Sequence, residues 1–243
     1  MTGGSRGIGA AIARAFAANG DRVAVHYGSS RQAAEEVLAS LAGDGHLIAP
    51  ADLRDPESIR SMVDAAAEQL GGIDVLVNNA GVFVAHPIES VGYEEWQRAW
   101  AETLGVNLIG AANVTWCALQ HMPRGGGSRI INVGSRGAFR GEPKNPSYGA
   151  SKAGIAAFGQ SIAKALAPLG IAVTTIAPGF VDTDMAAELL AGPTGDEIRA
   201  QSPFNRVATP EELAEAVLLL ASPHAEWASG AILDFNGASY LRM

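Results

Sequence analysis

A tyrosine and a lysine, Tyr148 and Lys152, stand four positions apart in the second half of the sequence. On a helix this spacing puts both side chains on one face, so the ammonium of Lys152 would lie near the phenol of Tyr148. A free phenol has a pKa of about 10, and a neighbouring ammonium favours the phenolate and lowers that pKa. Tyr148 could then donate a proton to a nascent alkoxide or remove one from an alcohol. The pair alone is weak evidence, because many helices carry this spacing by chance.

Ser135 directly follows an apolar run, residues 130–134, that predicts a strand. In open α/β sheets, ligands bind at the carboxyl ends of the strands. The hydroxyl of Ser135 could therefore hydrogen-bond a substrate oxygen and stabilise the charge that develops on it. Serine after a strand is also common in ordinary turns. The catalytic interpretation of Ser135 therefore depends on Tyr148 and Lys152 occurring in the same chain.

A glycine-rich segment, residues 2–9, directly precedes a predicted helix. Glycine tolerates the left-handed backbone of tight turns, and bare N–H groups at a helix N-terminus can hold a pyrophosphate. The spacing G-x-x-x-G-x-G differs from the dinucleotide fingerprint G-x-G-x-x-G, so an ordinary glycine loop stays an alternative. The residues predicted to contact the cofactor in this turn are Gly3, Ser5, Arg6, Gly7, Ile8 and Gly9.

The end of the next predicted strand indicates which nicotinamide cofactor the site prefers. An NAD site usually carries an acidic residue there, which accepts from the ribose 2′-hydroxyl. Residues 27–31 contain no carboxylate, whereas Arg6, Arg31 and two serines could hold a 2′-phosphate by charge-assisted hydrogen bonds. NADP(H) is therefore favoured over NAD(H). The alternative is that Arg31 is a solvated residue in the first turn of a helix and that the pocket accepts both cofactors. The residues predicted for this part of the site are Tyr27, Ser29, Ser30 and Arg31.

Strand and helix patterns alternate along the whole chain. Strands are predicted at residues 22–27, 46–50, 73–77, 129–133, 171–176 and 231–235. Helices are predicted at residues 8–19, 31–41, 56–70, 94–121, 148–167, 185–200 and 210–221, with a bend near Gly105 and Gly110. The alternation predicts an α/β fold, a Rossmann-type doubly wound parallel sheet with helices on both faces, in a single domain over residues 1–243.

Composition narrows the classes of function. A chain of 243 residues with 48% hydrophobic content can bury a sizeable core, and its net charge of −8, with no run of Lys or Arg, argues against nucleic acid as a partner. Cys117 is the single cysteine, which suits a reducing cytoplasm. No signal-like or membrane-length apolar run occurs, and the five scattered histidines predict no metal site and structural or solvated roles.

Taken in order, the glycine turn, the segment Asn78-Asn79-Ala80-Gly81, Ser135 and the Tyr-x-x-x-Lys pair resemble the short-chain dehydrogenase/reductase family over essentially the entire chain. The resemblance implies an NADP-dependent oxidoreductase that interconverts a small-molecule carbonyl and a secondary alcohol. It makes Ser135, Tyr148 and Lys152 the catalytic centre, and it assigns Asn107 to a water in a proton relay that leads to Lys152. Lys152 and Tyr148 would also contact the cofactor. The further cofactor contacts that it implies are Asp52 and Leu53 near the adenine, Asn79, Ala80 and Gly81, and Pro178, Gly179, Val181 and Thr183 beside the nicotinamide.

The substrate stays open at the level of sequence. The chain is similar to 3-oxoacyl-(acyl carrier protein) reductases, but steroid, sugar and small-ketone reductases are equally candidates, and only isolated arginines such as Arg124, Arg129 or Arg140 could face an acidic carrier protein. A non-catalytic dinucleotide-sensing protein is the alternative from another class, and the complete Ser-Tyr-Lys set argues against it. The resemblance implies a homotetramer, or a homodimer, built on the helices that carry Asn107 and Tyr148 and on the last strand. Substrate selection is predicted in residues 84–88, 138–146 and 185–204.

The chain departs from the family at its N-terminus. Family members have an apolar strand at mid-sheet immediately before the glycine turn, whereas here the sequence begins at Met1-Thr2-Gly3. A missing central strand leaves the neighbouring strand edges unpaired, a loss that is large beside a net stability of about 5–15 kcal/mol. We therefore expect the first strand to be missing or truncated, with weak folding or a rearranged sheet. One hypothesis is that Met1 replaces the final valine of that strand, and the intact mass of the native protein tests it.

Overall fold

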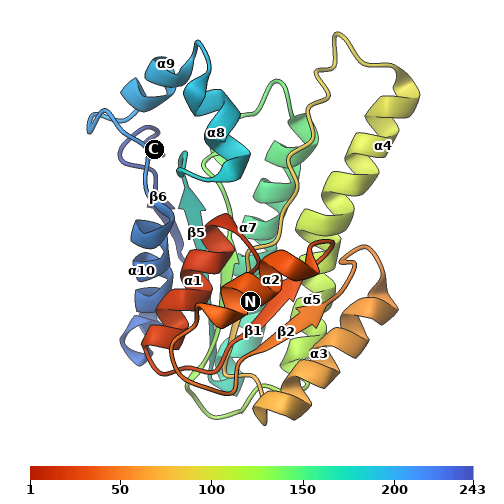
Figure 1. Cartoon of the computed structure of the whole chain (residues 1–243), viewed down its shortest axis with the longest axis vertical. Helices are drawn as coiled ribbons and strands as arrows, with labels where there is room; N and C mark the ends of the chain where they lie inside the picture. The colour runs from red at the N-terminus through yellow and green to blue at the C-terminus, as the bar shows by residue number, and fades with distance from the viewer. Residues whose placement is uncertain (243) are drawn as a thin grey trace.

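The computed structural model describes residues 1–242, in which parallel strands alternate with helices (Figure 1). The strands are β1 (Ala24–Tyr27), β2 (Leu47–Pro50), β3 (Val75–Asn78), β4 (Ser128–Val133), β5 (Ile171–Pro178) and β6 (Ile232–Phe235). The helices are α1 (Gly7–Ala18), α2 (Arg31–Ala39), α3 (Pro56–Leu70), α4 (Tyr93–Leu104), α5 (Ala111–Leu119), α6 (Gly137–Arg140), α7 (Pro146–Leu166), α8 (Asp184–Ala191), α9 (Gly195–Ala200) and α10 (Pro210–Ala221). Across these residues, no helix is long and apolar enough to cross a membrane.

The strands form two parallel sheets, β1-β2 and β3-β4-β5-β6, with the first residues of the chain between them. The N–H of His26 donates to the carbonyl of Met1 over 3.0 Å, and the N–H of Gly4 donates to the carbonyl of His26 over 2.8 Å. On the other side, the N–H of Thr2 donates to the carbonyl of Val77 over 3.0 Å. Residues 1–4 thus connect β1 with β3 by backbone hydrogen bonds without forming a strand of their own.

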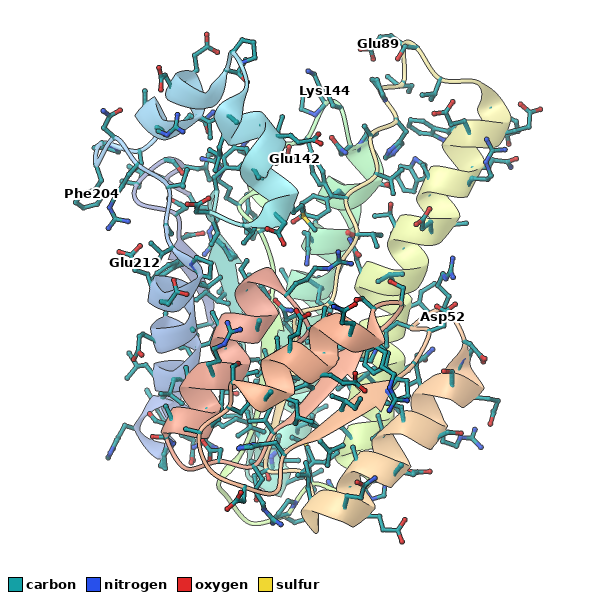
Figure 2. The ribbon with its side chains drawn as sticks, viewed as in Figure 1. Asp52, Glu89, Glu142, Lys144, Phe204 and Glu212 are labelled. Carbon is teal, nitrogen blue, oxygen red and sulfur yellow. The ribbon has the colours of Figure 1, made fainter. Side chains whose placement is uncertain are left out.

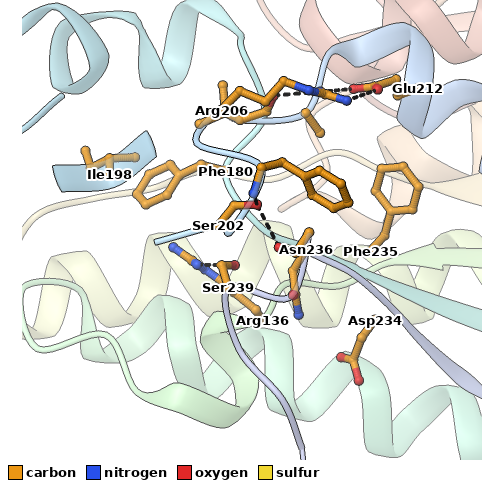
Figure 3. Close-up of a pocket in the computed structure, with 14 residues that line it drawn as sticks. Arg136, Phe180, Ile198, Ser202, Arg206, Glu212, Asp234, Phe235, Asn236 and Ser239 are labelled. Atoms are coloured by element: carbon orange, nitrogen blue, oxygen red, sulfur yellow. Dashed lines mark hydrogen bonds and ion pairs between the residues drawn. The ribbon is translucent and has the colours of Figure 1, made fainter. Parts of the chain in front are cut away.

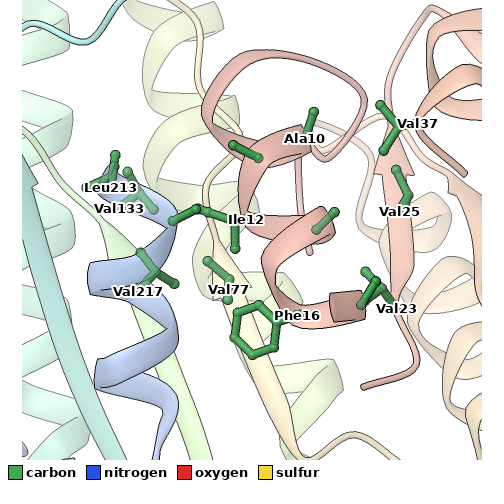
Figure 4. Packing of buried hydrophobic residues seen from close by; sticks show 14 of the residues in the cluster. Ala10, Ile12, Phe16, Val23, Val25, Val37, Val77, Val133, Leu213 and Val217 are labelled. Atoms are coloured by element: carbon green, nitrogen blue, oxygen red, sulfur yellow. The ribbon is translucent and has the colours of Figure 1, made fainter. Parts of the chain in front are cut away.

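Two hydrophobic cores cover the two faces of the strands. In the first, Ile12 and Phe16 of α1 pack with Val77, Val133 and Leu213 (Figure 4). The second core contains residues of α3, α5 and α7 against β3, β4 and β5. Because helices bury both faces, the strands read as almost continuous apolar runs. The prediction of a doubly wound α/β fold is confirmed, and the single domain over residues 1–243 stays a prediction.

A buried polar row crosses β3, β4 and β5 at one level. Asn78 stands opposite Asn132, and Asn132 stands opposite Thr175. The side-chain amide of Asn78 donates to the side-chain oxygen of Asn132 over 3.0 Å and to the hydroxyl of Thr115 over 2.9 Å. A Cβ added at Gly159 would lie 2.8 Å from the hydroxyl of Thr175, so helix α7 passes close to this row.

The helix predicted at residues 94–121 bends where the two glycines led us to expect it. Between α4 and α5 the chain forms a π-helical segment, η1 (Gly105–Gly110). A Cβ added at Gly110 would approach the carbonyl oxygen of Leu53 to 2.5 Å, which explains the need for glycine there. Single π-helical turns inside α-helices often occur at functional sites, and this one contains Asn107.

Two sequence-based assignments of helices need correction. The helix predicted at residues 185–200 is two helices, α8 and α9, because Gly192 and Pro193 interrupt it and proline cannot continue the hydrogen-bonded pattern. The short helix α6, directly after Ser135 and Arg136, was not predicted, and neither were the 3₁₀ segments η2 (Ala167–Leu169) and η3 (Pro223–Ala228). These elements span three to six residues, too short to show a helical period.

Candidate active site

The glycine turn has the backbone that its sequence predicts. Gly3 and Gly7 adopt φ angles of +61° and +51°, which side chains disfavour. A Cβ added at Gly3 would lie 2.9 Å from the Cα of Ala80, and one at Gly7 would lie 3.3 Å from a methyl carbon of Thr183. A Cβ added at Gly9 would overlap the carbonyl oxygen of Gly3. The turn is therefore bare backbone at the start of α1, and it adjoins two segments predicted to contact the cofactor.

Thr2 and Asn79 hold this turn against the end of β3. The hydroxyl of Thr2 accepts hydrogen bonds from the N–H groups of Asn79 and Ala80, over 2.9 and 3.1 Å. The side-chain amide of Asn79 donates in return to the carbonyl oxygens of Thr2 and Gly3, over 3.0 and 3.1 Å. Asn79 and Ala80 thus lie at the turn as predicted. Thr2 was not among the predicted site residues, because nothing in the sequence shows where its buried hydroxyl points.

His26 joins the turn to the ends of two strands. Its Nδ1 accepts a hydrogen bond from the N–H of Gly3 over 2.9 Å, and its Nε2 lies 3.1 Å from the carbonyl oxygen of Ala51. The neutral ring with hydrogen on Nε2 satisfies both partners. Burial lowers the pKa of His26 to about 4, so the ring is neutral near pH 7. The prediction of a structural role for His26 is confirmed.

The residues predicted for a 2′-phosphate differ in how available they are. Arg31 forms an ion pair with Glu35 over 2.7 Å, and Ser30 caps α2 by accepting from an N–H, which leaves its hydroxyl hydrogen free for a ligand. Arg6 is exposed at the start of α1, and across residues 1–242 it forms no ion pair. The side chain of Tyr27 is buried in the first core, and its contact with the cofactor stays a prediction.

Asp52 follows β2 and is half-exposed (Figure 2). Its carboxylate accepts two hydrogen bonds from the guanidinium of Arg54, over 2.9 and 2.7 Å, which lower the pKa of Asp52 to about 2. Leu53 is buried beneath Gly110. The contact of Asp52 and Leu53 with an adenine stays a prediction.

Ser135 and Tyr148, thirteen residues apart in sequence, meet at the carboxyl end of β4. The hydroxyl of Ser135 lies close enough to the phenol of Tyr148 to lower its pKa, and it accepts from the N–H of Gly137 over 3.0 Å. Tyr148 lies in the first turn of α7, where its ring makes an edge-to-face contact with Phe83, with 4.8 Å between ring centroids. The predicted serine–tyrosine pair is therefore assembled in the structure.

Burial dominates the electrostatics of the pair Tyr148 and Lys152. It raises the pKa of Tyr148 to about 12, opposed by the nearby hydroxyl of Ser135 and reinforced by the negative charge of Glu142. Burial lowers the pKa of Lys152 to about 8. The ammonium of Lys152 lies 5.7 Å from the ring centroid of Tyr148 and donates to the carbonyl of Val133 over 2.8 Å. The lowered pKa that the sequence led us to expect for Tyr148 is wrong for this structure.

Asn107 binds the segment after β3 to the helix of Lys152. Its side-chain amide donates to the carbonyl of Val82 and to the hydroxyl of Ser151, and its side-chain oxygen accepts from the N–H of Val82 over 2.8 Å. A Cβ added at Gly81 would lie 3.4 Å from that oxygen and 3.6 Å from the ammonium of Lys152. Asn107 and Gly81 therefore lie beside Lys152, and the water relay stays a prediction.

The segment after β5 returns to the glycine turn. Val181 is buried and pairs with Ala208 in an isolated parallel bridge, and Thr183 contacts the position of Gly7. A Cβ added at Gly179 would lie 3.1 Å from the Cα of Asn236, so the backbone passes close to the loop after β6. The segment 178–183 thus closes the side of the site opposite Asn79 and Ala80.

Glu142 is a site residue that the sequence did not single out, although it lies in a segment predicted for substrate selection. Its carboxylate lies 4.0 Å from the guanidinium of Arg140 and close to Gly137, where a Cβ would come within 2.5 Å of it. Burial raises the pKa of Glu142. Glu142 and Lys144 lie at the end of the molecule towards which the strands point (Figure 2). An acidic residue in a loop gives no signal in sequence that it will face a tyrosine.

This arrangement can bind a dinucleotide and move a proton. The bare turn at the start of α1 fits a pyrophosphate, because Gly3 and Gly7 carry no side chain and the N–H of Gly7 lies at the N-terminus of the helix. Ser135, Tyr148 and Lys152 lie beside the segments that line the same turn, with one hydroxyl pair able to contact a substrate oxygen.

Comparison with known proteins identifies the family. A family model described as enoyl-(acyl carrier protein) reductase matches residues 3–237. A crystal structure of a short-chain dehydrogenase from Burkholderia cenocepacia in complex with NADP superposes with a TM-score of 0.87 at 34% identity, covering 98% of this chain and 95% of that one. The chain belongs to the short-chain dehydrogenase/reductase family.

Two relatives show the range of this oxidoreductase family around the chain. A 3-oxoacyl-(acyl carrier protein) reductase of Vibrio cholerae is 36% identical, covering 99% of this chain and 96% of the relative. A cis-4-hydroxycyclohexanecarboxylate dehydrogenase of Sinomonas cyclohexanicum is 38% identical, covering 98% of this chain and 94% of the relative. The resemblance drawn from the glycine turn, Ser135, Tyr148 and Lys152 is confirmed. As a short-chain dehydrogenase/reductase, the chain is an oxidoreductase.

Proposed function

We propose that this short-chain dehydrogenase/reductase interconverts a ketone and a secondary alcohol with NADP(H), by proton transfer at Tyr148. The observation that carries the proposal is the proximity of the hydroxyls of Ser135 and Tyr148 beside the buried Lys152. The end of β4 and helix α7 bring these side chains together, and general acid–base catalysis needs such contact with the reacting oxygen.

Each residue of the catalytic group has a separate role in the proposed reaction. NADP(H), when bound, supplies or accepts hydride at the substrate carbon. Ser135 donates a hydrogen bond to the substrate oxygen, and Tyr148 gives that oxygen its proton in reduction and removes the proton in oxidation. A phenol with a pKa of about 12 stays protonated at neutral pH, which suits the direction of carbonyl reduction. Lys152 contacts the cofactor ribose, and Asn107 positions the segment beside it.

The proposed preference for NADP(H) is supported by the absence of a carboxylate in residues 27–31 and by the exposed Arg6 at the start of α1. The Burkholderia cenocepacia relative was solved in complex with NADP. In the proposed site, the N–H of Gly7 at the start of α1 holds the pyrophosphate against the bare turn, and Arg6 with Ser29 and Ser30 holds the 2′-phosphate. The segment 178–183 lies beside the nicotinamide.

Reduction of a 3-oxoacyl group on a carrier protein is a second candidate, favoured by the Vibrio cholerae relative at 36% identity. A hydroxy-acid substrate is supported in the same way by the name of the Sinomonas cyclohexanicum relative. Both fall within the proposed reaction, and a panel of oxoacyl thioesters, cyclic keto acids and neutral ketones separates them by kcat/KM.

The deciding experiment pairs cofactor binding with turnover. Purified protein is titrated with NADPH and NADH by fluorescence, and ketone reduction is measured for the wild type and for Tyr148→Phe. We expect tighter binding of NADPH and a loss of about 10²–10⁴ in kcat without loss of NADPH affinity. Full activity of Tyr148→Phe would overturn the proposed role of Tyr148. NADPH binding without turnover of any substrate would favour a sensing protein.

We propose further that the protein is a homotetramer in the cytoplasm. Trp116 and Ile109, on α5 and η1, are 62% and 56% exposed, which supports burial of these apolar side chains by another copy. Cys117 is a free thiol, as a reducing compartment allows. Mass photometry tests the assembly, and a homodimer would restrict the contact to one pair of helices.

A further inference from the structure

The guanidinium of Arg136 is a buried cation with neutral partners. The residue is 4% exposed, and it donates to the side-chain oxygen of Gln201 and to the hydroxyl of Ser239. The ring of Phe180 lies beneath it, 5.0 Å from the guanidinium carbon. Burial and the nearby charge of Arg140 lower the pKa of Arg136 to about 10. Buried charges are normally matched by an opposite charge, so this one calls for an anion.

Arg136 lines a cavity of about 260 Å³ between the segment after β5, the end of α9 and the loop after β6 (Figure 3). The two carboxylates that also line it are already paired. Glu212 accepts from Arg206 over 2.6 and 2.7 Å, and Asp234 accepts from Arg242 over 2.8 Å. Among residues 1–242, Arg136 forms no ion pair, so it is the charged side chain of this wall that lacks a counter-ion, because Arg242 from outside the wall neutralises Asp234.

Glu142 does not supply the missing anion. It raises the pKa of Arg136 through its charge, but this effect is smaller than that of burial or of Arg140. Its carboxylate stands 4.0 Å from the guanidinium of Arg140. Arg140 also donates to Gln201 over 3.2 Å, so two guanidinium groups share one amide oxygen. An amide oxygen is a weaker partner for them than a carboxylate would be.

The cavity is separate from the proposed catalytic group yet joined to it through the backbone. Ser135, Tyr148, Lys152 and Asn107 do not line it. Arg136 follows Ser135 directly, and its N–H donates to the carbonyl of Pro178 over 2.9 Å. A molecule bound in the cavity would therefore affect the position of two segments, the one that carries Ser135 and the one that carries the predicted nicotinamide contacts.

We propose that this cavity is a carboxylate-binding site in which Arg136 holds the carboxylate. A guanidinium presents two parallel N–H groups that match the two oxygens of a carboxylate. Hydroxyls of Ser202 and Ser239 lie in the same wall, and Phe180 and Phe235 provide apolar surface. The ligand is a small organic acid, with a ring or short alkyl chain against the phenylalanines and its carboxylate on Arg136.

A purely structural role is the competing explanation. Through Gln201 and Ser239, Arg136 joins the residue after α9 to the loop after β6, and Arg136→Met would loosen both whether or not a ligand binds. The test therefore needs a binding signal that a structural clamp does not produce.

The experiment uses benzoate as the probe and benzamide as its uncharged control. Binding to the full chain is measured by calorimetry and by the ¹⁵N–¹H signal of the Arg136 Nε group. We expect benzoate to bind and to shift that signal, and benzamide to bind at least about tenfold more weakly, since a charge-assisted hydrogen bond is worth roughly 1.5–3 kcal/mol. Equal binding of the two probes, or no binding of benzoate, would overturn the proposal.

Two test variants and one control variant locate the binding group. Arg136→Met should lower benzoate affinity at least about tenfold, whereas the double variant Arg206→Gln/Glu212→Gln removes a paired charge from the same cavity and should bind benzoate as the wild type does. Gln201→Glu places a carboxylate next to Arg136 within the chain. We expect this variant to be more stable to heat and to lose benzoate binding. Retained benzoate affinity in either Arg136→Met or Gln201→Glu contradicts the assignment.

The carboxylate could belong to the substrate or to a separate small molecule, and kinetics distinguishes these sources. This arm rests on the proposed function. If the acid is part of the substrate, benzoate competes with 4-oxocyclohexanecarboxylate, and Arg136→Met raises KM for that keto acid more than for cyclohexanone. If it is separate, benzoate changes the rate with cyclohexanone without competing. Because binding is measured without turnover, an inactive protein would overturn the proposed function and leave the binding test standing.

Discussion

The ammonium of Lys152 donates a hydrogen bond to the carbonyl oxygen of Val133 across 2.8 Å. This contact fastens α7 to β4 two residues before Ser135, so one side chain fixes the elements that carry both Ser135 and Tyr148. Lys152 thus has a positioning role in addition to its proposed contact with the cofactor.

The buried ammonium of Lys152 makes the free energy of unfolding depend on pH in the alkaline range. The pKa of Lys152 is lowered from 10.5 to about 8, so the unfolded chain binds this proton more readily between these values and the free energy of unfolding rises with pH across that window. We expect a contribution on the order of 1 kcal/mol per pH unit there. Urea titrations between pH 8 and 10 of the wild type and of Lys152→Met check it. A rise of equal size in the variant would assign it to other groups.

Glu142 should shift the pH dependence of alcohol oxidation. Its negative charge raises the pKa of Tyr148, so Glu142→Gln lowers that pKa and increases the phenolate fraction at a given pH. We expect the rising alkaline limb of kcat/KM for oxidation to move to lower pH. Glu89→Gln, at the same end of the molecule, is the control and should leave the profile in place (Figure 2). A shift to higher pH in Glu142→Gln would contradict the placement of its charge.

Arg6 and Arg31 should differ in their effect on cofactor choice. Arg6 is exposed without an ion pair in the part of the chain that the structure describes, whereas Arg31 is paired with Glu35. We expect Arg6→Gln to weaken NADPH about tenfold and to leave NADH unchanged, with a smaller loss for Arg31→Gln. Glu35→Gln frees Arg31 and should tighten NADPH. Fluorescence titration measures all three, and equal losses for both nucleotides in Arg6→Gln would place Arg6 away from the 2′-phosphate.

His26 should make the protein acid-sensitive. Its pKa is lowered from 6.5 to about 4, so the unfolded chain takes up this proton first and stability falls as the pH drops from 6.5 towards 4. A protonated ring also cannot accept the hydrogen bond from the N–H of Gly3. We expect a loss on the order of 3 kcal/mol over this window, absent in His26→Gln. Denaturant unfolding at several pH values measures it, and parallel curves would show that His26 does not titrate in this way.

The parts of the fold that local residues dictate could be predicted from the sequence. Helix α3 begins at Pro56 and ends before Gly71, and α10 begins after Thr209, whose hydroxyl caps it; both helices have the predicted bounds. Ser135 and Tyr148 were correctly expected in one site, because Ser135 directly follows β4 and Tyr148 lies in the first turn of the next long helix, α7. These signals lie within a few residues of the elements that they define.

Contacts that depend on distant side chains could not be predicted. The hydrogen bond from Lys152 to Val133 and the approach of Glu142 to the phenol each follow from rotamers and packing. The pKa of Tyr148 was wrongly predicted for the same reason. Spacing on a helix shows that Lys152 shares a face with the phenol but does not show that burial outweighs its charge.

The polar row formed by Asn78, Asn132 and Thr175 has a consequence for how the strands find their alignment. Apolar strands in a parallel sheet can slide past one another with little change in burial, and a slip by one residue turns every side chain to the opposite face. Such a slip would carry the amide of Asn78 away from its acceptors and leave it unsatisfied in an apolar core. The row therefore favours one alignment of the strands during folding. The position of the active-site residues at the carboxyl ends of these strands depends on that alignment.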